Sequence, residues 1–241
     1  MLSVPTLPAN LQANLGALHE RITKAARAAG RDPSSVRLLA VSKAFGADAI
    51  LRAAAAGQRA FGESYVQEAA AKIVCLRALR PDIAFEWHFI GPIQSNKTRA
   101  IAERFDWVQS VDRLKTAERL AEQRPEKLPL LNVLLQVNVS GEASKSGAAP
   151  DELSQLAIAV ERLPRLRLRG LMAIPAPQPD VAQQRFAFAR TNALFRQLRE
   201  DGLKLDVLSM GMSDDLDAAI AEGSTMVRVG TAIFGTRAPR R

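Results

Sequence analysis

A lysine ends a short apolar segment of the sequence. Residues 38–42 read Leu-Leu-Ala-Val-Ser, Lys43 follows them, and Phe45 and Gly46 end the pattern. A short apolar run before a turn is typical of a strand that is buried on both faces. A lysine at the end of such a strand lies at the rim of the core, where desolvation favours the neutral amine that can attack a carbonyl group. The alternative is a rim lysine that extends its ammonium group into water.

A second cationic residue lies inside a predicted strand near the end of the chain. Arg228 stands between Val227 and Val229. A buried charge must be paired or must face a ligand, so a structural ion pair is the alternative to a binding role. Together with Lys43, Arg228 suggests a ligand with a ring nitrogen. A guanidinium cannot accept a proton, so a pyridine nitrogen facing it would stay unprotonated and would be a poor electron sink.

Two predicted strands end in small residues that could bind an anion. Ser209 and Gly211 follow the seventh strand, and Gly230 and Thr231 follow the eighth. Glycines let backbone N–H groups approach an anion, and the two hydroxyl groups add donors. Ordinary glycine turns are the alternative at either position, but the two positions together favour a phosphate site. The aspartates at 214–215, expected in the first turn of the next helix, complement its dipole but would repel a phosphate placed directly on its N-terminus.

Eight apolar runs alternate with helical patterns. Strands are expected at residues 36–42, 59–62, 85–90, 107–111, 130–139, 166–174, 206–210 and 226–229. Helices are expected at residues 8–29, 47–56, 96–104, 112–123 with Asp112 as N-cap, 151–163 and 213–221. Two further helices are expected, one from Tyr65 to about Arg80 and a long one that follows the proline-rich loop after the sixth strand and runs through Glu200. This alternation indicates parallel βαβ units, and eight strands close naturally as a barrel. An open doubly wound sheet is the alternative, but no Gly-x-Gly-x-x-Gly turn follows the first strand.

The predicted architecture is α/β, a single-domain (β/α)8 TIM-type barrel. The barrel covers residues 36–235, with an extra N-terminal helix at 8–29 and a basic tail at 236–241. In such a barrel the ligand site lies at the carboxyl ends of the strands. These ends carry Lys43, Ser64, His88, Asn138, Met172, Ser209 and Thr231. His88 follows Glu86 on the same strand face and could be an acid or a base, but we expect a hydrogen-bonded structural histidine.

The composition excludes several classes of protein. The net charge of +8 invites a nucleic-acid partner, but no basic run is interleaved with aromatic residues, so none is expected. No apolar run is long enough to span a bilayer, and the N-terminus lacks the order of a signal peptide. Cys75 is the only cysteine, so we expect no intrachain disulfide and a reducing cytoplasm. No histidine, cysteine and aspartate cluster has metal-ligand spacing.

Six motifs occur in a fixed order along the chain. They are Leu39-Ala-Val-Ser-Lys43, Phe61-Gly-Glu-Ser-Tyr-Val-Gln-Glu68, Trp87-His-Phe-Ile-Gly-Pro-Ile-Gln-Ser-Asn-Lys97, Gly170-Leu-Met172, Leu208-Ser-Met-Gly-Met-Ser-Asp214 and Val227-Arg-Val-Gly-Thr-Ala-Ile-Phe-Gly235. Together they resemble the pyridoxal phosphate homeostasis proteins over about residues 36–235. The resemblance implies a single-domain barrel related to the N-terminal domain of alanine racemase. It also implies binding of pyridoxal 5′-phosphate without an established catalytic activity.

The resemblance implies a role for each site residue. Lys43 would carry the cofactor as a Schiff base, and Arg228 would face the pyridine nitrogen. The remaining implied cofactor-binding residues are Ser64, Met172, Ser209, Gly211, Gly230 and Thr231. The family usually reads Gly-Glu-Asn-Tyr where this chain has Ser64, and serine keeps a hydroxyl but loses the reach of the amide. Lys145 matches a Lys-Ser-Gly of the family and is either a second aldehyde contact or a solvated loop lysine.

Three functions are weighed. The first is a protein that stores, shields or delivers pyridoxal phosphate, and the second is a racemase or decarboxylase of the alanine racemase barrel type. The third is a cofactor-free Schiff-base aldolase, which fits poorly because Lys43 would lie beside a phosphate site and an arginine. Racemisation needs an acid–base group on each face of the substrate. In alanine racemase a tyrosine from a C-terminal β-domain supplies the second group, whereas this chain ends at the barrel and its only tyrosine, Tyr65, is expected at the rim.

The sequence therefore predicts a monomeric protein that binds pyridoxal phosphate covalently on Lys43 without turnover. Other B6 vitamers are further expected ligands, and apo-enzymes that need the cofactor are expected recipients.

Overall fold

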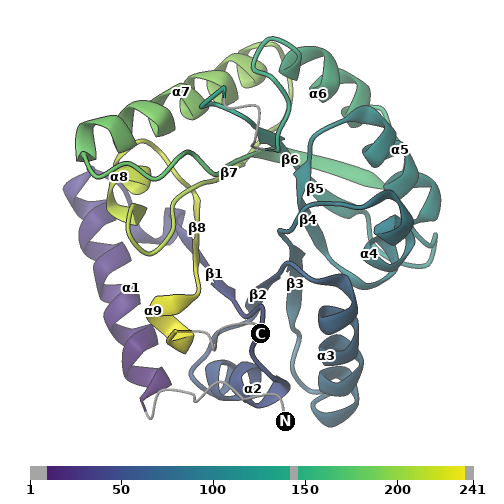
Figure 1. Ribbon diagram of the computed structural model, residues 1–241, viewed down its shortest axis with the longest axis vertical. Helices are drawn as coiled ribbons and strands as arrows, with labels where there is room; N and C mark the ends of the chain where they lie inside the picture. Colours follow the sequence, from purple (N-terminus) through teal and green to yellow (C-terminus); the bar gives the residue numbers. More distant parts are fainter. Residues whose placement is uncertain (1–9, 142–145, 237–241) are drawn as a thin grey trace.

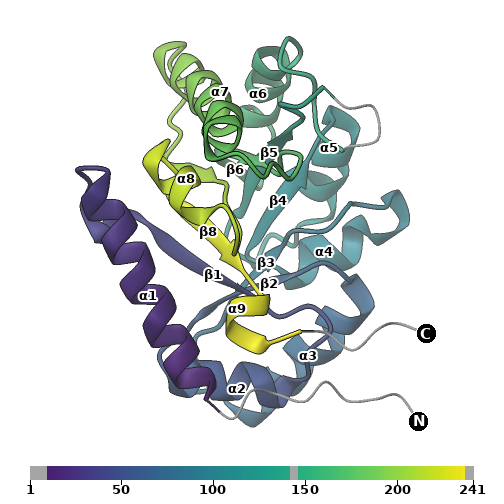
Figure 2. The same ribbon diagram turned by 60° about the vertical axis from the view of Figure 1, so that its left-hand side comes forward.

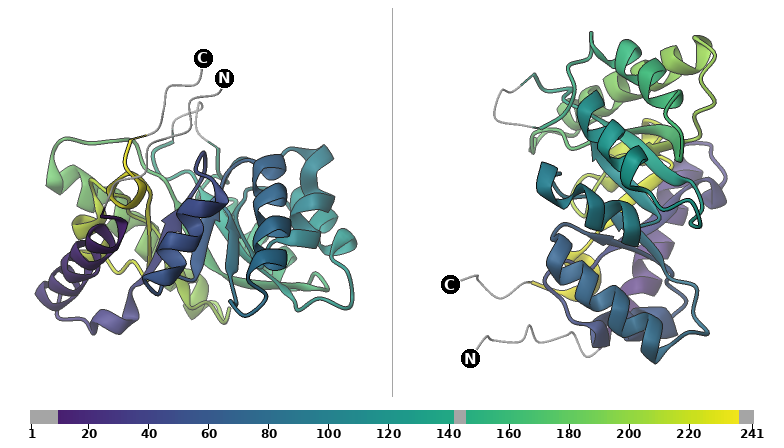
Figure 3. Two further views of the ribbon diagram at one scale, coloured as in Figure 1. Left: turned by 90° about the horizontal axis from the view of Figure 1, so that it is seen from below. Right: turned by 90° about the vertical axis from the view of Figure 1, so that its right-hand side faces the viewer.

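The computed structural model describes residues 10–141 and 146–236. Eight parallel strands pair in chain order and close into a barrel, as predicted. The strands are β1 Arg37–Val41, β2 Ala60–Glu63, β3 Glu86–Phe89, β4 Trp107–Val111, β5 Leu131–Val137, β6 Leu166–Ala173, β7 Val207–Ser209 and β8 Met226–Val229. Figure 1 looks into the barrel, and Figure 3 shows from two further directions that the helices lie outside the strands.

Helices follow the strands around the outside of the barrel. They are α1 Leu11–Ala28, α2 Ala47–Ala55, α3 Val66–Leu79, α4 Thr98–Arg104, α5 Leu114–Gln123, α6 Leu153–Glu161, α7 Val181–Glu200, α8 Leu216–Ala221 and α9 Thr231–Phe234. None of these helices is long and apolar enough to cross a membrane.

Several predicted helix starts are too early, because the chain turns before the helix begins, and α6 for example begins at Leu153 rather than at Asp151. Helix α5 begins after Arg113 rather than after Asp112, and no side chain caps it. Helix α8 begins at Leu216, with Asp215 as its N-cap residue, so residues 213–215 belong to the preceding turn. The short helix α9 was not predicted.

The extra N-terminal helix completes the outer ring. Within the described part of the chain, β8 is followed by the four-residue helix α9 alone, and α1 fills the space between α8 and α2 (Figures 1 and 2). The Asn14 side chain donates to the carbonyl of Ile233 at 3.1 Å. Beyond the end of α1, Arg31 Nη1 donates to the carbonyls of Ile220 and Ser224, both at 2.8 Å. Helix α1 therefore covers the seam where β8 meets β1.

The wall of the barrel separates two apolar cores. The outer core lies between strands and helices and includes the predicted stripe of α1, which is Leu11, Leu15, Leu18 and Ile22. The inner core consists of Leu39, Ala60, Trp107, Leu134, Met172, Val207 and Met226, with Ile90 packed against it. Polar side chains also enter the barrel, and the site depends on how they are paired.

Candidate functional site

The backbone on both sides of Lys43 is fixed by a buried group of charged residues. Ser42 Oγ donates to Glu63 Oε1 at 2.7 Å, and Lys72 Nζ donates to the carbonyl of Ser42 at 2.9 Å. On the other side of Lys43, the N–H of Ala44 donates to Glu68 Oε1 at 2.6 Å. Ala44 has a positive φ of 70°, a conformation that costs energy in any residue with a Cβ. These contacts position the half-buried Lys43 at the carboxyl end of β1.

Lys72 connects the members of this group, which we name the Lys72 cluster (Ser42, Glu63, Glu68 and Lys72). Its ammonium group lies 2.8 Å from Glu63 Oε1 and 2.7 Å from Glu68 Oε1. Glu63 is fully buried, and burial raises the pKa of its carboxyl group, although the charge of Lys72 opposes that rise. Glu63 Oε2 accepts no hydrogen bond from the described residues. Lys72 is therefore the partner on which the buried carboxylate depends.

The sequence contained a signal for the Lys72 cluster. Val66, Ala69, Ile73 and Leu76 form the buried face of α3, and Lys72 lies on the same face. A lysine on a buried helical face requires a partner, and Glu68 is four residues earlier. The pairing with Glu63 and Ser42 could not be predicted, because it depends on how α3 packs against β1 and β2.

Arg228 lies inside the barrel wall and is held by neighbouring strands. Its Nη1 donates to the carbonyl and to Oγ of Ser209, both at 2.7 Å, and its Nη2 donates to the carbonyl of Ala173 at 2.9 Å. Burial lowers the pKa of Arg228 to about 10, and the charge of Asp215 opposes this shift, so the guanidinium stays charged at neutral pH. Arg228 forms no ion pair within 4.0 Å with any residue of 10–141 or 146–236.

Ser209 lies deeper than its predicted role requires. Its side chain is fully buried, accepts from Arg228 and donates to Gln109 Oε1 at 2.7 Å. A hydroxyl group has one proton to donate, and Gln109 already accepts it. The expectation that this hydroxyl donates to a phosphate stays a prediction, and such a contact would require the bond to Gln109 to break.

The other predicted phosphate residues lie where β7 and β8 end. Gly211 has a φ of 94°, and a Cβ there would lie 2.5 Å from the Cβ of Ala219. Helix packing alone therefore requires glycine at this position. Gly230 is the N-cap residue of α9, and Thr231 is exposed. Asp215 Oδ1 accepts from the N–H of Met212 at 2.6 Å, and the repulsion of a phosphate by Asp214 and Asp215 stays a prediction.

The remaining predicted site residues differ in depth. Ser64 is half-buried after β2, Met172 is fully buried in the inner core, and Asn138 accepts from the N–H of Gly141 at 3.1 Å. His88 is fully buried inside the barrel rather than at its mouth, and its bond to Glu86 supports the structural interpretation. Lys145 and residues 237–241 of the basic tail lie outside the described residues. Tyr65 is 39% exposed, as expected for a rim residue.

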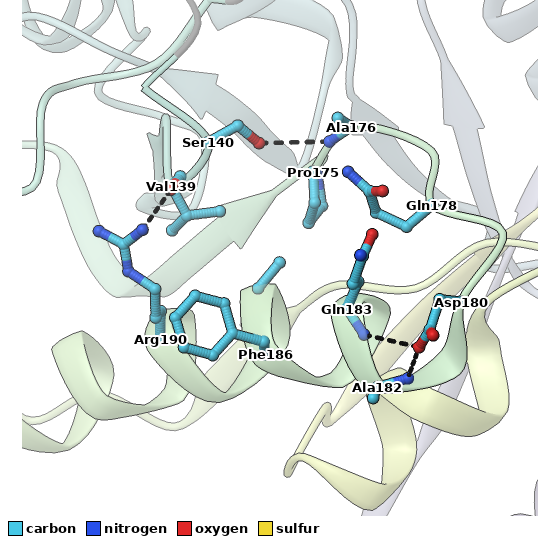
Figure 4. A pocket seen from close by; sticks show the side chains of 11 residues that line it. Val139, Ser140, Pro175, Ala176, Gln178, Asp180, Ala182, Gln183, Phe186 and Arg190 are labelled. Carbon is cyan, nitrogen blue, oxygen red and sulfur yellow. Dashed lines mark hydrogen bonds between the residues drawn. The ribbon is translucent and has the colours of Figure 1, made fainter.

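Two cavities open at the carboxyl end of the barrel. One, of about 250 Å³, is lined by Ile90 and Pro92 after β3, Gln136 in β5, Ser146 after β5 and Ile174 after β6. The other, of about 500 Å³, lies between α7 and the loops that follow β5 and β6, where Phe186, Arg190 and Gln183 border it (Figure 4). Neither cavity is lined by any of the predicted cofactor-binding residues. We assign the candidate site to the ends of β1, β7 and β8, where the predicted cofactor-binding residues Lys43, Ser209, Gly211, Gly230 and Thr231 lie.

No group of three or more histidine, cysteine, aspartate or glutamate side chains among the described residues could hold a metal ion. The candidate site combines an amine, a guanidinium and glycines at the ends of two strands.

The fold and this site define a class of protein. Residues 13–238 match the model of the alanine racemase N-terminal domain family. Alanine racemase of Clostridium difficile shares the fold, with a TM-score of 0.68 and 19% identity over 97% of this chain and 59% of that chain. The chain is thus an alanine racemase N-terminal-type barrel.

More similar proteins identify the family within this class. The pyridoxal phosphate homeostasis protein of Pseudomonas aeruginosa is 62% identical over 224 residues, which are 93% of this chain and 94% of that protein. PipY of Synechococcus elongatus, solved with pyridoxal phosphate bound, has a TM-score of 0.81 and 38% identity, and the match covers 93% of this chain and 100% of PipY. The chain belongs to the pyridoxal phosphate homeostasis protein family.

We expect Lys72→Met to lower the free energy of unfolding by about 3–5 kcal/mol, because it leaves the buried Glu63 without its cationic partner. The double variant Lys72→Met/Glu63→Gln should recover part of the loss. Urea denaturation measures both changes, and Lys204→Met, at an exposed lysine, is the control. Equal stability of Lys72→Met and the unaltered protein would contradict the role assigned to the cluster.

Proposed function

We propose that this protein binds pyridoxal 5′-phosphate as a Schiff base on Lys43 and serves in pyridoxal phosphate homeostasis without turnover. The observation that carries the proposal is the placement of an amine and a guanidinium on adjacent strands. Lys43 follows β1, Arg228 lies in β8, and Leu39 of β1 pairs with Arg228 in the sheet. The names of the relatives and the bound ligand of PipY support the same function.

The chemistry of the residues fits this cofactor. The Lys43 amine would condense with the aldehyde and release water. Three of the five N–H groups of Arg228 bind Ser209 and Ala173, and the other two are the donors proposed for the pyridine nitrogen. Gly211, Gly230 and Thr231 are proposed to hold the phosphate, since the first N–H groups of α9 have no partner within that helix.

Two features favour binding over catalysis. Arg228 cannot protonate the pyridine nitrogen, so the bound cofactor would stabilise a carbanion poorly. Tyr65, the only tyrosine, begins the segment that leads into α3 and is exposed, whereas racemisation needs a base held against the face opposite the lysine. A racemase or decarboxylase of the same barrel type remains the alternative function.

The finer parts of the proposal concern partners and location. We propose that the protein also binds other B6 vitamers and that apo-enzymes receive the cofactor from it. We further propose that it is a monomer located in the cytoplasm. The single cysteine, Cys75, is exposed and free, which suits a reducing compartment.

Lys43→Ala should abolish the yellow colour of the protein mixed with pyridoxal phosphate and the borohydride-stable adduct on the peptide that contains residue 43. Lys115→Ala, at an exposed lysine of α5, is the control and should keep both. Mass spectrometry after reduction locates the adduct. A full yield of adduct on another lysine of Lys43→Ala would refute the assignment.

Thr231→Ala should weaken the binding of pyridoxal phosphate by roughly 1.5–3 kcal/mol, the range for a hydrogen bond to a charged group. The binding of pyridoxal, which lacks the phosphate, should be weakened much less. The control Thr236→Ala, at an exposed threonine, should leave the binding of both ligands unchanged. Absorbance titrations give both dissociation constants. Equal losses for the two ligands would place the Thr231 hydroxyl away from the phosphate.

The protein loaded with pyridoxal phosphate should release the cofactor to an apo-enzyme but should not exchange the α-proton of amino acids. Incubation with a panel of L- and D-amino acids in deuterated water, followed by mass spectrometry, measures the exchange. Exchange or decarboxylation at enzyme-like rates that disappears in Lys43→Ala would establish the alternative function instead.

A further inference from the structure

A continuous series of hydrogen bonds crosses the interior of the barrel and ends at Arg228. Arg228 Nη1 lies 2.7 Å from Ser209 Oγ, which lies 2.7 Å from Gln109 Oε1. Gln109 Nε2 lies 2.9 Å from His88 Nδ1, and His88 Nε2 lies 2.6 Å from Glu86 Oε1. We name these five residues the interior chain. The side chains of Ser209, Gln109 and His88 are fully buried, so no water competes for these contacts.

The two ends of the interior chain fix the direction of the bonds at those ends, and the orientation of the Gln109 amide fixes the bonds between them. A guanidinium can only donate, and an ionised carboxylate can only accept. Ser209 therefore accepts from Arg228 and donates its one proton to the amide oxygen of Gln109. The Gln109 amide nitrogen then faces His88 Nδ1, which must accept, so the imidazole is neutral and its Nε2–H donates to Glu86.

A second contact supports this orientation of the Gln109 amide. Gln109 Nε2 also lies 3.2 Å from the sulfur of Met226, a weak acceptor that suits the other N–H of the amide. The opposite orientation would need a proton on both nitrogens of His88 and would leave Ser209 to accept from both Arg228 and Gln109.

The charges around His88 agree with the neutral form. Burial lowers the pKa of His88, and the hydrogen bond and charge of Glu86 oppose this shift. Arg37, which donates to Glu86 Oε1 at 2.8 Å, lowers the pKa of His88 further, whereas the more distant Asp106 raises it.

We propose that Ser209, Gln109 and His88 are positioning residues that hold Arg228 in the orientation that faces the pyridine ring. The proposal rests on the function proposed above. Arg228 forms no ion pair among the described residues, so its orientation depends on the two carbonyls and the Ser209 hydroxyl. That hydroxyl accepts a hydrogen bond from Arg228 and donates one to the Gln109 amide oxygen. The Gln109 amide is held in this orientation because His88 accepts a hydrogen bond from its nitrogen.

The first test observes the imidazole nitrogens in the full chain without ligand. The chain has two histidines, so the His19→Gln variant assigns the His88 signals in a long-range ¹H–¹⁵N spectrum. At neutral pH the spectrum should show His88 with a proton on Nε2 and none on Nδ1. Gln109→Glu places an acceptor opposite Nδ1 and should move a proton to it. A protonated Nδ1 in the unaltered protein would overturn the interior chain.

The second test measures binding of pyridoxal phosphate and of pyridoxal. Ser209→Ala and Gln109→Met should each weaken the binding of both ligands by the same factor, about tenfold or more. The factor is the same because Ser209 and Gln109 act through Arg228 on the ring, which both ligands share. Ser110→Ala is the matched control, since Ser110 is equally buried on β4 but donates to the carbonyl of Gly91. It should leave both affinities unchanged. A larger loss for pyridoxal phosphate than for pyridoxal would assign Ser209 to the phosphate and overturn the proposal.

A double-mutant cycle separates positioning from a general loss of structure. In the Arg228→Gln background, Ser209→Ala should cause no further loss of affinity. The same loss in both backgrounds would show that Ser209 acts independently of Arg228 and would overturn the proposal. If the unaltered protein bound no pyridoxal phosphate, the proposed function would fail, whereas the imidazole signals would still decide whether the interior chain exists.

Discussion

The contact between the Lys72 ammonium and the Glu63 carboxylate is the interaction on which the site depends. A buried carboxylate costs several kcal/mol unless a cation and hydrogen bonds compensate it. Lys72 provides that cation and also binds the carbonyl of Ser42, so one side chain connects β1, β2 and α3. Because Glu68 from the same cluster also binds the N–H of Ala44, the backbone around Lys43 is fixed before any ligand arrives.

The second requirement is that every polar group inside the barrel has a partner. The inner core is apolar around Trp107 and Met172, and an unpaired donor there would cost about 1–3 kcal/mol. The interior chain meets this requirement with a single consistent set of donors and acceptors. Trp107 also stacks on His88, with ring centroids 5.1 Å apart. Apolar packing and hydrogen bonding thus restrain the same imidazole, which explains why a polar path is compatible with a stable barrel.

The sequence predicted the barrel well because its eight buried strands read as apolar runs and its helices as periodic ones. It also placed Lys43 at the end of one apolar run and Arg228 inside another, because a charged residue stands out in such a run. It could not give the depth of Ser209, because a strand-end serine can face the mouth or the interior. The partners of Lys72 and His88 come from other strands, and only the closed barrel brings them together. Helix starts at Asp112 and Ser213 were misplaced because turn residues there resemble caps.

The position of α1 has a consequence for the order in which the protein is completed during synthesis. Lys43 follows the first strand, Arg228 lies on the last, and α1 covers the seam between these strands. A ribosome-bound chain that has not yet released β8 has an open barrel, and the amine is then separated from the guanidinium. Long-range pairing of this kind is slow to form. The amine and the guanidinium of the proposed site are therefore brought together only after β8 has been translated.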